Sequence, residues 1–271
     1  MKSIREIFRI GYGPSSSHTM GPRKAAELFL AAHPNAARYQ AHLYGSLSAT
    51  GKGHLTDAAI IDVIPSVEIV WHEDFLPFHP NGMRFCAWDT QDNLLDDWTV
   101  YSVGGGALAE ENQEPGTKNK DSLLSTLNSQ LSTDIYPLTR LSEIKDYCEK
   151  MGWDYWEYVE HYEGKEIWDY LREVWQVMRE AVERGLDHEG VLPGPLHLRR
   201  KAASYYIKVA AYRDNLRTRG LVFSYALAVS EENASGGKIV TAPTCGSCGV
   251  LPAVLYHTWR SRDFSETRIL H

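Results

Sequence analysis

The sequence predicts an α+β protein, with a small N-terminal α/β domain followed by an all-helical domain. In the first half, apolar and polar residues alternate at strand spacing between short turns. From about Leu141 onward, apolar residues instead recur at steps of three and four, which is the period of a helix. This change of period predicts a boundary near residue 138 and two domains, over 1–138 and 139–271.

The first half predicts one helix followed by several strands. Proline suits the first turn of a helix, so Pro22 and the apolar stripe after it predict a helix start there. Tyr39, Ala41 and Leu43 alternate with polar neighbours, as in a half-buried strand. The expected strands cover 38–43, 67–71, 83–88 and 98–103, the last two joined by a polar turn at 89–93.

The second half predicts helices separated by breaks. A regular apolar stripe predicts a helix from about Ile167, which we expect to end at Gly185. Two prolines make 191–195 a rigid break. Further helices are expected over 198–215 and 218–234, and the polar stretch 110–121, which lacks periodicity, is expected to be a loop.

Composition excludes several classes of protein. The net charge is −7 and no long block of lysine and arginine occurs, which argues against nucleic-acid binding. No apolar run has membrane-spanning length and no signal peptide is recognisable, so we expect a cytoplasmic protein. The four cysteines are too few and too irregular for a disulfide scaffold.

The stretch 13–22 carries the strongest local signal. Four hydroxyl side chains and the imidazole of His18 lie between Pro14 and Pro22, directly before the predicted helix. A helix N-terminus with free backbone N–H groups binds anions, so a carboxylate or phosphate is the expected guest. The alternative is an ordinary helix start capped by serine or threonine.

A second signal is the glycine-rich stretch 241–252, which contains Cys245 and Cys248. Pro252 again suits a first helical turn, so we expect the thiols to lie at a helix N-terminus that lowers their pKa. Four interpretations remain open for this pair: half of a zinc site, a redox dithiol, part of an iron–sulfur site, or two small buried thiols.

Several short motifs follow one another along the chain, at 15–22, 45–47, 50–57, 79–83, 101–106, 190–194, 231–234 and 241–244. In their shared order, these motifs resemble the iron–sulfur-dependent L-serine dehydratases, also called L-serine ammonia-lyases. The resemblance implies an N-terminal β domain and an all-helical α domain. It also implies a 4Fe–4S cluster with one iron open to substrate, and a lyase that removes water and then ammonia from L-serine to leave pyruvate. Serine degradation and gluconeogenesis would be its setting.

The resemblance also assigns roles to residues. It implies His18 and His54 as catalytic, Cys248 as a cluster ligand, and a hydroxyl loop that faces the cysteine loop across two domains. Cys245 stands where many members carry asparagine, so its role as a ligand is doubtful. The substrate-binding residues would be Ser15, Ser16, Ser17 and Thr19.

The family's remaining cluster cysteines are expected beyond His271. We therefore expect an incomplete helical domain, belonging to a truncated or split enzyme that forms a homodimer or associates with a missing α-domain segment. One alternative is a non-catalytic fragment that binds a small anion or amino acid. Another is pyridoxal-phosphate chemistry through a Schiff base, for which Lys238 and the glycines 104–106 are the candidates.

Overall fold

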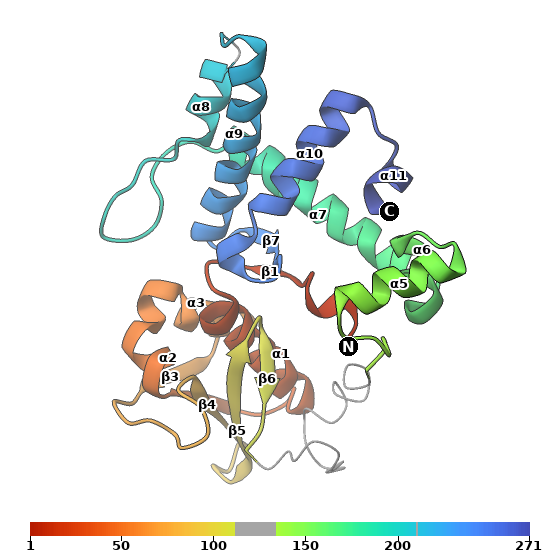
Figure 1. Cartoon of the computed structure of the whole chain (residues 1–271). Coiled ribbons are helices and arrows are strands. Elements are labelled where there is room, and N and C mark those ends of the chain that lie inside the picture. Colours follow the sequence, from red (N-terminus) through yellow and green to blue (C-terminus); the bar gives the residue numbers. More distant parts are fainter. Residues whose placement is uncertain (112–133, 210) are drawn as a thin grey trace. The chain divides into compact units, whose positions relative to one another are not determined.

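The computed structural model describes residues 1–111, 134–209 and 211–271. These residues form two compact units (Figure 1). We call Tyr12–Gln130 the sheet unit, and Met1–Gly11 together with Leu131–His271 the helical unit. The loop predicted over 110–121 lies almost entirely outside the described residues. The domain boundary at 138 stays a prediction.

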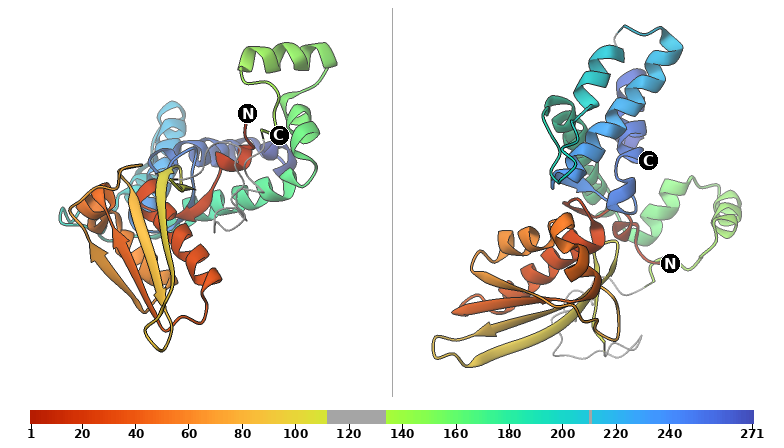
Figure 2. Two further views of the ribbon diagram at one scale, coloured as in Figure 1. Left: turned by 90° about the horizontal axis from the view of Figure 1, so that it is seen from below. Right: turned by 90° about the vertical axis from the view of Figure 1, so that its left-hand side faces the viewer.

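The sheet unit is built on five strands in the order β3-β2-β4-β5-β6. The parallel pair β2–β3 is joined by helices, and the other neighbours are antiparallel (Figures 1 and 2). The strands expected over 38–43, 67–71 and 83–88 are confirmed, and the strand expected over 98–103 lies within a longer strand. The bounds are β2 (Arg38–Leu43), β3 (Val67–Trp71), β4 (Gly82–Trp88), β5 (Leu94–Gly104) and β6 (Ala107–Ala109).

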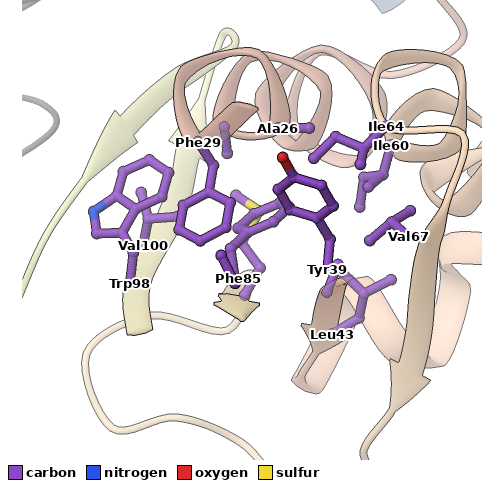
Figure 3. Packing of buried hydrophobic residues seen from close by; sticks show 14 of the residues in the cluster. Ala26, Phe29, Tyr39, Leu43, Ile60, Ile64, Val67, Phe85, Trp98 and Val100 are labelled. Carbon is purple, nitrogen blue, oxygen red and sulfur yellow. The ribbon is translucent and has the colours of Figure 1, made fainter. Parts of the chain in front are cut away.

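Two helices, α1 (Gly21–Ala32) and α3 (Thr56–Val63), cover one face of this sheet. Figure 3 shows their apolar side chains directed onto the strands. Phe29 of α1 is fully buried and lies parallel to the Trp98 ring, with ring centroids 6.2 Å apart. Tyr39, Ala41 and Leu43 are the buried residues of β2, as their alternation predicts. This packing fixes α1 and hence the segment that leads into it.

Three short helical segments flank α1 and α3. The π-helix η2 (Ser16–Met20) runs directly into α1, and Pro22 lies in the first turn of α1 as expected. The others are α2 (Gly45–Thr50) and the 3₁₀ helix η3 (Gly51–His54), which leads into α3.

The helical unit is centred on two helices of 21 residues, α7 and α9. The stripe that predicts α7 is buried, including Val174, Trp175 and Met178. In the described residues, no helix has both the length and the apolar character to cross a membrane. The elements are η1 (Ile4–Glu6), β1 (Ile10–Tyr12), α5 (Leu141–Met151), α6 (Tyr155–Glu163), α7 (Ile167–Asp187), α8 (Ala202–Val209), α9 (Asp214–Ala234), β7 (Lys238–Val240), η4 (Cys245–Ser247), α10 (Val250–Arg262) and α11 (Glu266–Leu270).

Several helix boundaries differ from the sequence-based expectation; the helix expected over 218–234, for example, already begins at Asp214. Gly185 does not end α7, which continues to Asp187; a Cβ at this position would lie 2.3 Å from the carbonyl oxygen of Ala228 on α9. Glycine is therefore needed for close helix packing. The helix expected over 198–215 is only α8, because residues 191–199 double back through a β-bridge between Val191 and Arg199.

Candidate functional site

The hydroxyl loop, residues Ser15–Thr19, is closed by its own side chains. The Ser15 Oγ accepts a hydrogen bond of 3.1 Å from the His18 amide. The Ser15 amide in turn donates to Thr19 Oγ1 over 3.2 Å. Ser15 is thus a capping residue, as the alternative interpretation of this segment expects. No hydrogen bond among the described residues uses the amides of Ser16 and Ser17, so the loop also keeps two donors for an anion.

His18 is held at both ring nitrogens. Its Nδ1 lies 2.9 Å from Ser17 Oγ, and its Nε2 lies 2.9 Å from Ser46 Oγ of α2. Burial, and then the positive charge of nearby His54, lower the pKa of His18 below its ordinary value. A neutral imidazole between two hydroxyls can orient a polar ligand, but neither of its nitrogens is free to take a proton.

His54 differs from His18, because the hydrogen bond found for its ring in the described residues is at one nitrogen, Nδ1. Its ring lies 4.7 Å from the His18 ring, centroid to centroid. Its Nδ1 lies 3.0 Å from the carbonyl oxygen of Thr50, which can only accept a hydrogen bond. The Nδ1 of neutral His54 must therefore carry the proton, which leaves the lone pair on Nε2. This is the tautomer that a general base requires.

Reasoning from the sequence missed four residues of this cluster. Ser46, Thr50 and Thr56 lie within the motifs quoted above, but only the fold shows that they contact the histidine segments. The fourth is Ser102 on β5, which also lies within a quoted motif and is fully buried with no hydrogen-bond partner for its Oγ among the described residues. A Cβ on Gly21 would lie 2.2 Å from that oxygen, so a glycine is required where α1 begins.

The cysteine loop, residues 241–249, belongs to the helical unit. Cys245 and Cys248 are 2% and 1% exposed. Burial raises the pKa of both thiols to about 12, so the expectation of a lowered pKa is wrong. The helix N-terminus is present, because α10 starts at Val250, but the loss of hydration outweighs it.

The described residues do not fit a complete metal centre or cluster. A 4Fe–4S cluster with one iron open to substrate still needs three protein ligands, one for each of the other irons. No group of three histidine, cysteine or acidic side chains suited to a metal gathers in the described parts of the chain. The two thiols could supply part of a ligand set at most, and we derive no reaction step through a cluster.

Two glutamates beside the cysteine loop in sequence have structural partners. Glu232 is buried and accepts hydrogen bonds from Arg184, His188 and Arg200 over 2.8–3.2 Å. Burial alone would raise the pKa of Glu232, but these hydrogen bonds lower it. Glu231 accepts from the amides at the start of α8. Both carboxylates thus hold the helical unit together.

The helical unit also contains an apolar cavity of about 450 Å³. Trp156, Trp168, Trp175 and Met178 are among its lining residues, with Arg268 beside them. A small zwitterion needs several polar partners. The polar cluster of the sheet unit therefore suits an amino acid better than this cavity does.

Comparison with known families gives matches to two successive stretches of the chain. Residues 68–270 match the family model described as serine dehydratase alpha chain, and residues 3–64 match the one described as serine dehydratase beta chain. The chain belongs to the serine dehydratase family. The resemblance inferred from the motifs is thereby confirmed.

Curated relatives support this membership. The chain is 36% identical to L-serine dehydratase TdcG of Escherichia coli, over 99% of this chain and 69% of that protein. It is 34% identical to L-serine dehydratase of Haemophilus influenzae and 31% identical to that of Helicobacter pylori, each over 94% of this chain. These alignments cover 66% and 65% of the two relatives. This family member thus spans about two thirds of the length of such relatives.

Proposed function

We propose that the chain acts as an L-serine ammonia-lyase, converting L-serine into pyruvate and ammonia. Its relatives are named L-serine dehydratases, and it belongs to their family. The single observation that carries the proposal is the tautomer of His54: its Nδ1 donates to the Thr50 carbonyl oxygen, which leaves Nε2 as the basic nitrogen, and its ring lies 4.7 Å from the His18 ring of the hydroxyl loop, centroid to centroid. Cytoplasmic location and homodimer formation remain part of the proposal.

The carboxylate of L-serine would bind at the hydroxyl loop. The amides of Ser16 and Ser17 and the hydroxyls of Ser15 and Ser17 are the donors that suit a carboxylate there. His18, whose ring is held by Ser17 and Ser46, would help to orient the bound substrate. A bound carboxylate lies next to the Cα–H bond that has to break, so this orientation would bring that proton toward His54.

In the proposed reaction, His54 Nε2 takes the Cα proton, and the β-hydroxyl leaves as water when the protonated His54 returns that proton to it. The product, 2-aminoacrylate, tautomerises to an imine. Water then hydrolyses the imine to pyruvate and ammonia. The Cα proton is weakly acidic and hydroxide is a poor leaving group, so a positioned base supplies only part of the catalysis.

A 4Fe–4S cluster is part of the proposal through the family resemblance, with Cys248 and, doubtfully, Cys245 as ligands. An open iron would act as a Lewis acid toward the leaving hydroxyl. Since two thiols do not complete such a centre, further ligands would have to come from outside the set that the described residues offer.

This incomplete ligand set favours a second candidate function, the binding of L-serine or another small carboxylate without turnover. The hydroxyl loop and His18 belong to the sheet unit, and their arrangement does not involve the cysteines. Binding could therefore persist where catalysis does not.

One experiment separates the two functions. The protein would be purified and reconstituted without oxygen, and serine-dependent pyruvate formation and serine binding by calorimetry would both be measured. Under the first proposal, pyruvate forms, and His54→Gln lowers kcat by about 10²–10⁴-fold. His33→Gln is the matched control, because His33 pairs with Asp96 outside the hydroxyl loop.

Serine binding without pyruvate would establish the second function and remove the first. If neither binding nor pyruvate is observed, both are wrong.

A further inference from the structure

Two buried threonines connect the segments that carry the two histidines. Thr19 Oγ1 donates to the carbonyl oxygen of His54 over 2.6 Å. Thr56 Oγ1 donates to the carbonyl oxygen of His18 over 2.5 Å. The threonines are 2% and 0% exposed. Each histidine segment therefore provides a hydroxyl to the backbone of the other, and we call Thr19 and Thr56 the threonine pair.

This reciprocal arrangement fixes one histidine against the other. His18 lies in η2 and His54 at the end of η3, 36 positions apart in the sequence. The cross-connections are made by side chains, and they end at the backbones of His18 and His54 themselves. The two rings lie 4.7 Å apart, centroid to centroid, where these two backbone connections bring their segments together.

The turn after His54 has an independent need for such an anchor. Leu55 has φ 56° and ψ 33°, a left-handed conformation that residues with a bulky side chain rarely adopt. Thr56 follows directly, and its hydrogen bond to His18 lies where that turn enters α3. The bond thereby stabilises a backbone shape that the turn would not favour by itself.

Thr19 has no spare capacity for substrate in this arrangement. Its hydroxyl donates to His54 and accepts from the Ser15 amide. A hydroxyl has only one proton to donate, so Thr19 cannot give a second hydrogen bond to a carboxylate. This favours a structural connection over the substrate-binding role expected from the family resemblance.

We propose that Thr19 and Thr56 are positioning residues that hold His18 and His54 in the paired geometry required for proton transfer. The catalytic consequence rests on the proposed function, whereas the geometric one does not. Without the pair, the His54 ring would keep its bond to Thr50 but lose its fixed place beside His18 and the hydroxyl loop.

The geometric part is tested by NMR on the 271-residue chain with labelled histidines. In the unaltered chain, we expect a nuclear Overhauser effect between the His18 and His54 ring protons. Thr56→Val, which keeps the side-chain shape but removes the hydroxyl, should weaken this effect. It should also raise the pKa of His18 toward its ordinary value of 6.5, because burial and the nearby His54 charge both hold that pKa down.

Thr56→Ser restores a hydroxyl and should recover both signals. Thr99→Val on β5 is the matched control, and it should leave both unchanged. Thr19→Val tests the other half of the pair should Thr56→Val fail to fold. Absence of the ring contact in the unaltered chain, or its full persistence in either valine variant, would overturn the proposal.

The catalytic part is tested in the reconstituted enzyme. Thr56→Val should lower kcat by about 10- to 100-fold while KM for serine changes by less than about threefold, because the base is misplaced but the carboxylate donors remain. Thr56→Ser should recover most of kcat. If the unaltered enzyme forms no pyruvate, the proposed function fails, and the NMR result still decides whether the threonine pair holds the histidines. Equal loss of kcat in the valine and serine variants would contradict the positioning role.

Discussion

Cys245 and Cys248 show how strongly burial can outweigh a favourable helix terminus. A helix N-terminus contributes about 0.3–1 kcal/mol toward an anion, which is less than one pKa unit. The thiols rise from an ordinary pKa of 9.0 to about 12. Desolvation is thus the larger effect by at least a factor of three, and both thiols stay protonated at neutral pH.

Slow alkylation of these thiols is the expected consequence. At pH 8, a pKa of about 12 instead of 9.0 lowers the thiolate fraction by about 1000-fold, and the thiolate is the reacting species. Iodoacetamide should therefore modify Cys245 and Cys248 at least about 1000-fold more slowly in the folded chain than in urea. The rate should rise about tenfold for each pH unit, as followed by mass spectrometry of the peptides.

Ser261→Cys supplies the matched control, because residue 261 is exposed on the same helix, α10, that follows the cysteine loop. That new thiol should react at the rate of a free cysteine. Rapid modification of Cys248 in the folded chain at pH 8 would show that its thiol is not held in a desolvated site.

The hydroxyl loop was largely predictable from the sequence, since Pro22 and the apolar stripe locate a helix start and the serines precede it. The partners of His18 and Thr19 were not predictable from local spacing. Ser46 and His54 lie 28 and 35 positions further along the chain, so only the folded sheet unit brings them near. The prediction of a lowered pKa for the two thiols was wrong for a related reason. Residue spacing identifies a helix terminus but does not reveal whether that terminus is buried.

Among the helices, the close contact between α7 and α9 determines how a substitution of Gly185 changes the stability of the chain. Replacing glycine by alanine inside a helix ordinarily stabilises it by up to about 1 kcal/mol. At Gly185, the new Cβ would lie 2.3–2.8 Å from backbone atoms of Ala228, and backbone cannot move aside as a flexible side chain can. Overpacking of this kind costs about 1–3 kcal/mol, so the substitution should destabilise the chain.

Gly185→Ala should therefore lower the free energy of unfolding of the helical unit by about 1–3 kcal/mol in urea, followed by tryptophan fluorescence. Gly246→Ala is the control in the same unit, because a Cβ there would meet only Thr244 Oγ1, at 3.8 Å. A gain of stability in Gly185→Ala would mean that α7 and α9 are not in this close contact.

Element positions were predictable where one period dominated, as in β2 and α7. The ends of an element were less predictable where a residue distant in the sequence determines them. The start of α8 is an example: Glu231, about 30 positions later, accepts the amides of Lys201 and Ala202 and so fixes where the helix begins. The apolar period at 198–215 carries no sign of that carboxylate.

The N-terminal segment Met1–Gly11 shows what periodicity cannot predict about the organisation of the chain. The domain expected over 1–138 stays a prediction, but in the structure this segment belongs to the helical unit. The Met1 carbonyl accepts the amides of residues 135 and 136, and the Ser3 hydroxyl donates to Glu163. Farther along, Arg9 exchanges hydrogen bonds with Thr241 next to β7. Each bond joins positions more than 130 apart, beyond the range of any local pattern.

A chain that lacks residues 1–11 should therefore lose stability in the helical unit and not in the sheet unit. At about 0.5–1.5 kcal/mol for each hydrogen bond, the lost contacts add to several kcal/mol. The core of the sheet unit, from Ala25 to Val100, contains no residue of that segment. Hydrogen exchange should thus show weaker protection of α7 and α9 amides and unchanged protection of β2, β4 and β5.

Adding the peptide 1–11 should restore protection to the helical unit, while a peptide of the same composition in scrambled order should not. The restoration is expected because the Ser3, Ile4 and Arg9 contacts are made within the helical unit and do not depend on the covalent link to Tyr12. If protection instead falls equally in β2 and β4, the N-terminal segment stabilises the sheet unit too, and the division of the chain into these two units is wrong.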